Sequence, residues 1–363
     1  MISKYLSLLA LLSLFIPLLS NAAQYAGTIS KIRGKVEILS NGSATVKGKG
    51  PHVKYNGRFY TISEGSVGKK VKLGEVIRTG KRSIVKIIFD NGDQFMVSPG
   101  SEYSLSLPSN KREGNALINL TRGKFRAIIS KEGPRNKMKV RTRNAAMGVR
   151  GTDFFVNSKG FDRSEVSVLR GKVSLKTTTS PQPKNVVNID PKTNKKTTVK
   201  QTAKEVTLET GYSANLVTTP KINDVLNKDK KSIQKIAKME IRETIVEVKR
   251  TSKQKLVSIQ KATKIEKVNK TGKADKKVNK VVAKNIAKLE KKAIAVTLKD
   301  IKTYTPKLYE KIKKNNVQST EELNTQVVAA AHKIAPKDIK PDLDDLEDED
   351  LGEDAYDKYF KVE

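Results

Sequence analysis

A short turn built on glycine recurs along residues 32–217 and limits what this part of the chain can fold into. The copies are IRGKVEIL at 32–39, TRGKFRAI at 121–128, LRGKVSL at 169–175 and, in degenerate form, LETGYSANLV at 208–217. In each copy, apolar residues flank a glycine that interrupts strand alternation, as a β-bulge or a tight corner requires. The repeat predicts an all-β domain with glycine corners, of a β-roll or solenoid type.

Residues 83–100 contain two further turn motifs of the same kind. The segment IVKIIF at 84–89 alternates as a strand does, and Asn91-Gly92 separates it from a second apolar run. Asn-Gly between apolar strands strongly indicates a hairpin, because both turn positions favour positive φ. Pro99-Gly100 supplies the next corner. Backbone geometry therefore explains these glycines better than the close approach of a ligand does.

In their order and spacing, these segments resemble the FecR domain family over residues 27–176. The matching pieces are GTISKIRGKV at 27–36, LGEVIRTG at 73–80, SIVKIIFDNGDQFMVSPGSEYSL at 83–105, LINLTRGKF at 117–125, VRTRNAAMGVRGTDFFV at 140–156 and VSVLRGKVSL at 166–175. The resemblance implies an all-β envelope domain in a family best known for relaying signals across the periplasm to a sigma factor. It implies no catalytic residue. The family-motif positions, expected to be structural, are Arg33, Gly34, Arg122, Gly123, Arg150, Gly151, Thr152, Asp153, Phe154, Arg170 and Gly171.

The first 23 residues have the composition of an export signal. Lys4 precedes an apolar run at 5–19 that is shorter than the roughly 20 residues of a membrane-spanning helix. Small residues follow, and we expect cleavage after Ala22 or Ala23, with a retained anchor as the alternative. The mature chain is therefore expected to be periplasmic or secreted. Only Met1–Lys4 precede the apolar run, so we expect no direct anti-sigma activity from a cytoplasmic segment.

The composition argues against several kinds of site. The chain has no cysteine, which excludes disulfides and thiolate metal clusters. His52 and His332 are its two histidines and lie far apart in sequence, so a histidine metal site is not expected. Asp90, Asp93 and Asp153 have no histidine, cysteine or second acid placed to form a catalytic pair. With no nucleotide-binding, nucleophile-elbow or zinc motif, we expect no enzyme activity and no cofactor.

The character of the sequence changes along the chain and predicts its organisation. The expected parts are a signal peptide at 1–23, a FecR-like β domain at 25–217, a lysine-rich helical region at 221–335 and an acidic disordered tail at 341–363. Within the β domain we expect a core at 27–176, a linker rich in Thr, Pro, Asn and Lys at 177–204, and a closing strand at 206–217. Helices are expected at about 223–260, about 275–302, from Thr305-Pro306, and from the capping box Ser319-x-x-Glu322.

The charge of the chain is extreme, with 72 Lys and Arg against 38 Asp and Glu and a formal net charge of +34. Such a chain is expected to bind an anionic envelope polymer or an acidic protein surface, in a salt-dependent way. Beyond residue 181 lysine dominates over arginine, which favours diffuse contacts, and aromatic residues are too sparse to stack bases. Sequence-specific nucleic-acid binding is therefore not expected. The candidate contacts are Lys276, Lys277, Lys280, Lys284, Lys288, Lys291 and Lys292.

The role of the helical region stays open at this level. Its helices could form a helical hairpin or lie along the β domain with their lysines solvated, form a partly disordered polyanion-binding arm, or lie on a membrane surface. The sequence favours an exported, non-enzymatic scaffold or ligand-sensing protein of the cell envelope, whose basic helices bind a partner or an anionic polymer. The alternative is a periplasmic signal-transduction regulator that acts on a membrane-bound partner of a sigma-factor pathway.

Overall fold

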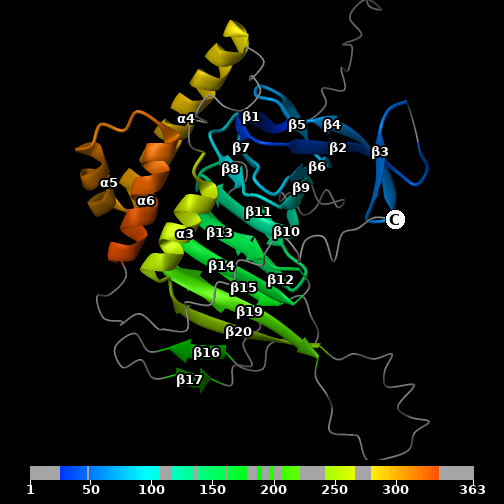
Figure 1. Cartoon of the computed structure of the whole chain (residues 1–363). Coiled ribbons are helices and arrows are strands. Elements are labelled where there is room, and N and C mark those ends of the chain that lie inside the picture. The colour runs from blue at the N-terminus through cyan, green and yellow to red at the C-terminus, as the bar shows by residue number, and fades with distance from the viewer. Residues whose placement is uncertain are drawn as a thin grey trace, which may run out of the picture.

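The computed structural model describes residues 25–46, 49–106, 117–133, 138–160, 162–177, 186–189, 196–199, 206–220, 242–265 and 279–334. Over these residues the chain is mostly β, with twenty strands and four helices (Figure 1). The prediction of a β-rich part followed by helices is confirmed at this level. The expected cleavage site at Ala22 and Ala23, the candidate contacts Lys276 and Lys277, and the acidic tail lie outside the described residues.

The strands form two layers, here called sheet A and sheet B, which share strand β10. Sheet A runs in the order β5 (Lys70–Lys72), β1 (Tyr25–Arg33), β7 (Ile84–Ile88), β8 (Gln94–Val97), β10 (Leu117–Ile128), β13 (Asp153–Ser158), β14 (Arg163–Arg170), β19 (Tyr212–Pro220), β20 (Arg242–Arg250), β16 (Val186–Ile189) and β17 (Lys196–Val199). Sheet B runs in the order β3 (His52–Tyr55), β4 (Arg58–Glu64), β2 (Val36–Ser43), β6 (Val76–Thr79), β9 (Glu102–Ser106), β10, β11 (Met138–Arg141), β12 (Ala145–Val149), β15 (Lys172–Thr177) and β18 (Val206–Glu209). Neighbours are antiparallel except β10 with β11 and β16 with β20.

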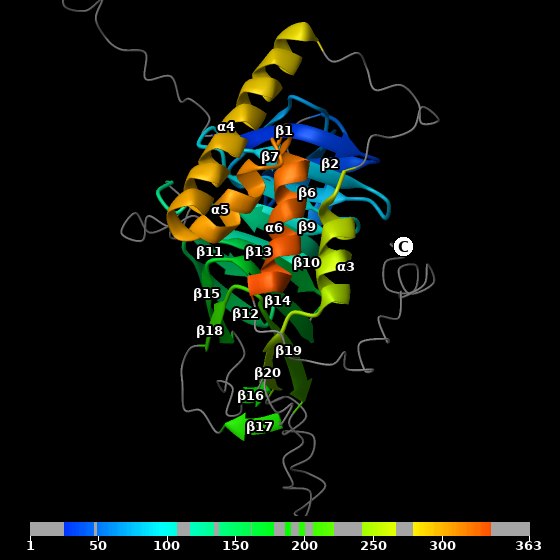
Figure 2. The same cartoon turned by 90° about the vertical axis from the view of Figure 1, so that its left-hand side faces the viewer.

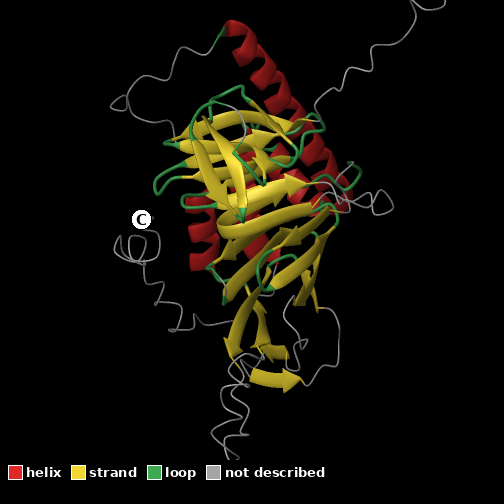
Figure 3. Cartoon of the chain, turned by 90° about the vertical axis from the view of Figure 1, so that its right-hand side faces the viewer, coloured by secondary structure: helices red, strands yellow, loops and turns green. Residues whose placement is uncertain are grey.

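One apolar core lies between the two sheets, which Figure 3 shows from the side opposite to the helices. Its centre is a group of aromatic rings in edge-to-face and tilted contact, an arrangement that ring quadrupoles favour. The ring centroid of Phe95 lies 4.4 Å from that of Phe89 and 5.1 Å from that of Phe125. Phe125 also contacts Tyr103 of sheet B, with centroids 5.4 Å apart. The two sheets are therefore joined by their side chains as well as by β10.

The recurring glycines are the points where the chain passes from one sheet to the other. Gly34 joins β1 to β2, Gly151 joins β12 to β13, and Gly171 joins β14 to β15. Gly123 lies inside β10, where its pairing changes from β9 to β8 and β13. The four φ angles are +72°, +60°, +90° and +91°, respectively, and this region is strained for any residue with a Cβ. The angles bear out the corner interpretation, whereas winding as a roll or solenoid stays a prediction.

Replacing Gly123 by alanine is expected to destabilise the fold by about 3 kcal/mol, combining left-handed backbone strain with overpacking. An added Cβ would lie 2.5 Å from the Cα of Ser101, and backbone cannot move aside as a flexible side chain can. The matched control is Gly100→Ala, where φ is +66° but no atom lies within 4 Å of the new Cβ. Urea unfolding should show a loss of only about 1 kcal/mol for the control. Equal losses for the two variants would contradict the corner role of Gly123.

Four helices form a layer over one face of sheet A, and this layer is called the helical layer below (Figures 1 and 2). They are α3 (Lys253–Thr263), α4 (Lys280–Tyr304), α5 (Pro306–Lys313) and α6 (Thr320–Ile334). Helices α4, α5 and α6 share a small apolar core of their own, made by Ile301, Leu308, Ile312, Leu323 and Val327. Within the described part of the chain, no helix is both long and apolar enough to span a membrane. Of the three arrangements left open, the described helices adopt the first and lie along the β part.

The prediction of a helix at about 223–260 is wrong over residues 242–250, which form strand β20. This strand pairs antiparallel with β19 along its whole length, from Arg250 opposite Tyr212 to Arg242 opposite Pro220. Its sequence, RETIVEVKR, is rich in β-branched residues, which favour a pleated surface, and the unpaired edge of β19 offers the hydrogen-bonding partner. Among the described residues of the expected helix, those from Lys253 onward are helical, as α3.

Two further expectations about the β part are corrected. The segment expected to be a linker, 177–204, contains the paired strands β16 and β17. The expected closing strand at 206–217 is two strands, β18 and β19, because Gly211 at a φ of +85° turns the chain between them. The limits of the parts as folding units stay predictions.

The later helices agree with their sequence motifs. Helix α4 covers most of the expected 275–302, and Pro306 starts α5. At the start of α6, the Ser319 hydroxyl accepts a hydrogen bond from the Glu322 amide at 3.2 Å, as in a capping box. The Glu322 carboxylate accepts from the amide of Gln318 at 3.0 Å rather than from that of Ser319. The capping-box motif therefore predicted the start of this helix correctly.

Candidate functional site

The outer face of sheet A carries charged and polar side chains that the helical layer covers. Lys86 of β7, Gln94 of β8, Arg126 of β10, Asp153 of β13 and Arg170 of β14 are each 3% exposed or less. Side chains alternate along a strand, so Lys86 faces the helices because its neighbours in β7 face the core between the sheets. A polar sheet face that is buried under helices needs a partner for each charge.

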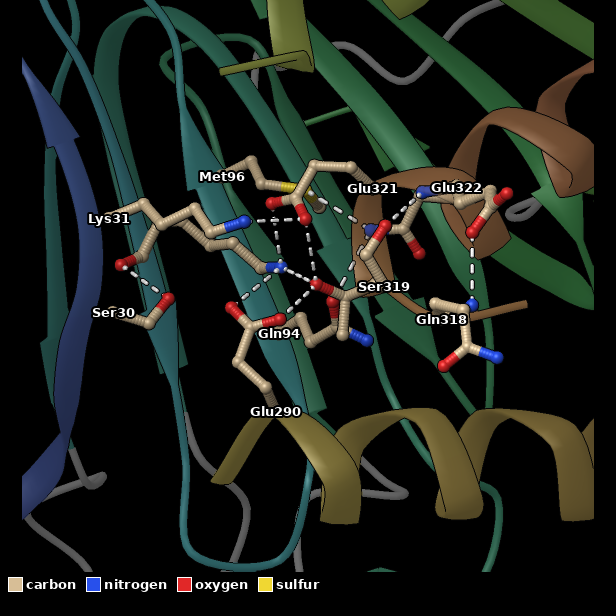
Figure 4. A network of polar contacts seen from close by, with 12 residues as sticks. Ser30, Lys31, Gln94, Met96, Glu290, Gln318, Ser319, Glu321 and Glu322 are labelled. Atoms are coloured by element: carbon tan, nitrogen blue, oxygen red, sulfur yellow. Dashed lines mark hydrogen bonds and ion pairs between the residues drawn. The ribbon is translucent and has the colours of Figure 1, made fainter. Parts of the chain in front are cut away.

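Lys86 is held by residues from two helices. Its Nζ contacts the Thr320 hydroxyl and lies 3.2 Å from Glu321 Oε1 and 3.5 Å from Glu290 Oε1. Thr320 in turn donates to Glu290 Oε2 at 2.6 Å. The ammonium donates hydrogen bonds to Thr320 and Glu321, and Glu290 adds a second negative charge beside it. Figure 4 shows Glu290 entering from α4 and Glu321 from α6, with Lys31 of β1 reaching the same carboxylate of Glu321 at 2.6 Å.

The electrostatics of this cluster are set by burial and by the opposed charges. Burial lowers the pKa of Lys86 from its ordinary value of 10.5, while the carboxylates of Glu321 and Glu290 act in the opposite direction. Burial alone would raise the pKa of Glu321, but Lys86 and Lys31 outweigh it and lower this pKa to about 2. Glu321 is therefore an anion at neutral pH, and its ion pair with Lys86 links α6 to β7.

The second ion pair is buried more completely. Arg126 Nε donates to Asp153 Oδ1 at 2.8 Å, and its Nη2 donates to Asp153 Oδ2 at 2.7 Å. This is the bidentate geometry that makes arginine–carboxylate pairs strong. The same Nη2 donates to the backbone carbonyl of Asn324 at 3.3 Å, which ties the pair to α6. The Asn324 amide donates to Gln94 Oε1 at 3.3 Å.

The other helices make polar contacts with the same sheet. Arg170 Nη1 lies 3.6 Å from Asp300 Oδ2 of α4, and the Ser98 hydroxyl donates to the carbonyl of Ala262 in α3 at 2.7 Å. Among the described residues, the Arg170 Nε and Nη2 atoms and Asn324 Oδ1 are buried without a hydrogen-bond partner. Buried polar atoms of this kind normally have a hydrogen-bond partner in protein or in ordered water.

One small apolar cluster also joins the sheet to the helices. It consists of Phe155 and Leu169 from sheet A together with Leu256, Ile259, Val328 and Ala331 from α3 and α6. The interface thus combines ion pairs and amide contacts with apolar packing. Contacts of this mixed character are typical of surfaces that can separate, whereas permanent interfaces are more apolar.

Residues 75–174 match the model of the family described as FecR protein. The matched segment is called the FecR domain below. It contains Lys86, Gln94, Arg126, Asp153 and Arg170, so the face under the helices belongs to the FecR domain itself. The helical layer lies outside the matched segment.

Two solved structures, each described as a "putative anti-sigma factor" from Parabacteroides distasonis ATCC 8503, are similar to this chain. The first is 16% identical with a TM-score of 0.28, and the match covers 39% of this chain and 54% of that one. This chain therefore spans about half the length of that structure. The second is 13% identical with a TM-score of 0.28, and the match covers 49% of this chain and 99% of that one. At these TM-scores neither likeness carries a conclusion. The comparison with curated proteins found no match.

The motif residues of the FecR domain do not gather at one place. Most lie at separate corners, where their glycines turn the chain, and Phe154 lies in the core. Asp153 and Arg170 are the two that join the interface with the helices, and Arg122 pairs with Glu102 of sheet B at 2.9 Å. The positions are Arg33 and Gly34 at the end of β1, Arg122 and Gly123 in β10, Arg150, Gly151 and Thr152 before β13, Asp153 and Phe154 in β13, and Arg170 and Gly171 at the end of β14. Their structural role stays a prediction.

The sequence interpretation missed Lys86, Arg126, Asp300 and Glu321. For the two cations the available indication was a charged residue inside an otherwise apolar strand, in IVKII and in KFRAII. The lysines proposed for polyanion binding do lie together on exposed parts of α4, at Lys280, Lys284, Lys288, Lys291 and Lys292. Among the described residues, no group of three or more histidines and acids could hold a metal ion.

Proposed function

We propose that this chain is a non-enzymatic signal-transduction regulator of the cell envelope. It acts by protein contact through its FecR domain on a membrane-bound partner of a sigma-factor pathway. The observation that carries the proposal is the FecR match over 75–174, the segment that supplies the charged face of sheet A. Of the two functions open from the sequence, this match favours the regulator over the scaffold that binds an anionic polymer.

The proposed mechanism uses the helical layer as a cover. The layer is held over the FecR domain by ion pairs at Lys86 and Arg170, by a hydrogen bond from Arg126 to the Asn324 carbonyl and by a small apolar cluster. Opening it would expose a charged surface that water can solvate, so the open state need not unfold the sheets. The partner is then a protein that binds the open state better than the closed one and so shifts the population.

Two finer statements belong to the same proposal. The glycine corners support a β-roll scaffold, because positive φ angles recur at several described passages between sheet A and sheet B, at Gly34, Gly151 and Gly171 among them. The apolar segment at 5–19, followed by Ala22 and Ala23, supports export through a cleaved signal peptide to the periplasm. A domain placed there can meet the outer face of an inner-membrane protein.

A reversible lock on α4 tests the proposal. A Cβ built on Gly68 would lie 3.5 Å from the Cβ of Val282, within the about 3.5–4.5 Å that a disulfide needs. The chain has no cysteine, so the variant Gly68→Cys/Val282→Cys can form one disulfide and no other. In cells of the native host, the tagged wild-type chain should co-purify with an inner-membrane protein. The oxidised variant should lose that protein, and reduction should restore it.

The control is Gly68→Cys alone, which carries the same backbone strain at a φ of +87° but cannot form the link. It should capture the membrane protein as the wild type does. If the oxidised double variant captures the protein equally well, opening of the helical layer is not required for binding. If no inner-membrane protein is captured by any form, the regulatory function is wrong.

A second candidate function rests on the exposed lysines of α4. Lys280, Lys284 and Lys288 follow one another at four-residue spacing, which places them along one side of the helix, and all three are exposed. Their charge supports salt-dependent binding of an anionic envelope polymer. Lys280→Gln/Lys284→Gln/Lys288→Gln should weaken retention of the chain on immobilised lipopolysaccharide at low salt. Unchanged retention would remove this candidate.

A further inference from the structure

An open groove of about 360 Å³ lies beside the first turn of α3, at the end of the interface away from Lys86. Its walls come from β14, β19 and β20, from the residues around the β13–β14 turn, and from the start of α3. Five cationic side chains line it: Lys159, Arg163, Lys249, Arg250 and Lys255. The acids in its lining are Glu165 and Glu247. The groove thus carries an excess of positive charge.

Two features of the local structure affect the charge of the groove. Lys255 pairs with Glu165 across the groove, so one acid is already neutralised. The first turn of α3 adds the positive end of a helix dipole, with Ser252 as its N-cap accepting from the Lys255 amide at 3.1 Å. Arg163 and Lys159 are exposed at the rim. A ligand for such a groove is an extended chain with several negative charges.

The described part of the chain ends at the level of the helix that borders this groove. Val328 and Ala331, in the second half of α6, share one buried cluster with Leu256 and Ile259 of α3. Figure 2 shows α3 and α6 side by side, with the end of α6 level with the start of α3. From Ile334, at the end of α6, the chain reaches Asp342 in eight residues, a span of up to about 28 Å.

The segment beyond α6 is complementary to the groove in charge. Residues 341–363 hold 11 Asp and Glu against two Lys, in a chain whose overall net charge is +34. We propose that residues 342–357 bind in the groove in cis, which makes the groove a site for acidic peptides that the chain's own C-terminal segment occupies. The tether gives this segment a high effective concentration, so an acidic partner must compete with it.

The experiment compares full-length chains that differ only in charge. In the neutralised variant, the acids at 342–357 are replaced by Asn and Gln. The probe is a fluorescent synthetic peptide with the natural sequence of 341–357, and binding is followed by anisotropy. We expect the neutralised variant to bind the probe at least about tenfold more tightly than the natural chain, because its own segment no longer competes. Adding Lys159→Gln/Arg163→Gln to the neutralised variant should remove most of this gain.

The matched control removes two exposed charges elsewhere, by Lys313→Gln/Lys314→Gln in the neutralised variant, and should leave binding unchanged. Carbodiimide cross-linking of the natural chain should join acids of 342–357 to Lys159, Lys249 or Lys255. Cross-links to the α4 lysines, or loss of probe binding in the control, would overturn the proposal. Equal probe affinity of the natural and neutralised chains would overturn it as well. None of these readouts depends on a membrane partner, so the regulatory function can fail separately.

Discussion

Arg126→Ala is expected to destabilise the folded chain by about 3–5 kcal/mol, because it leaves the Asp153 carboxylate buried without its cation. The two side chains are 2% and 1% exposed, and their contact is bidentate, so neither group can be hydrated in place. Asp153→Asn should cost nearly as much, since the guanidinium then stays charged in a buried site. The measurement is the free energy of unfolding from urea titrations of each variant.

Two controls separate the pair from its surroundings. The double change Arg126→Met/Asp153→Leu removes both charges, and its loss should be clearly smaller than the sum of the single losses. Lys172→Ala breaks an ion pair with Glu209 whose side chains are 69% and 58% exposed, and should change stability by less than about 1 kcal/mol. A loss for Arg126→Ala no larger than that for Lys172→Ala would show that the buried pair contributes no more to the free energy of unfolding than an exposed pair does.

The second large effect is expected for Glu290→Gln/Glu321→Gln, which removes both carboxylates from Lys86 without changing their size. The Lys86 side chain is 1% exposed, so its ammonium would remain in a buried site with only a hydroxyl and two amides nearby. We expect the contact between α6 and β7 to weaken by about 3–5 kcal/mol. Hydrogen exchange should then be faster in α6 amides, while β10 and β13 keep their protection.

The controls for this variant use a remote charge and a rescue. Glu132→Gln removes the exposed partner of Lys299 on the same helical layer and should leave exchange in α6 unchanged. Adding Lys86→Met to the double variant removes the uncompensated cation and should restore much of the protection. If α6 and β10 instead lose protection together, the helical layer and the sheets unfold as one unit, which would contradict a cover that opens.

Features with a local cause could be predicted from the sequence. Glycines after Arg33, Arg122 and Arg170 adopt positive φ, as their interruption of strand alternation indicated. Helix α6 starts where Ser319 and Glu322 form a capping box, because that chemistry involves neighbouring residues only. In both cases the residues that fix the backbone lie within a few positions of each other.

Features that depend on distant residues could not be predicted. Strand β20 lies in a lysine-rich stretch with helical spacings, and its pairing with the distant edge of β19 favours the strand that its β-branched residues also allow. Lys86 and Arg126 were visible as charges inside apolar strands, but their partners Glu321 and Asn324 lie 235 and 198 positions further along the chain. Such pairings arise from the tertiary fold, and a single sequence contains no local indication of them.

The order of the parts along the chain has a consequence for synthesis. Residues 86–170, which make the charged face of sheet A, leave the ribosome well before residues 253–334, which cover it. In a nascent chain, this face of the FecR domain is therefore exposed to water until the helices have been synthesised. During this interval the exposed sheet face carries the charges of Lys86, Arg126 and Arg170. Charged side chains disfavour aggregation of an exposed sheet with other nascent chains.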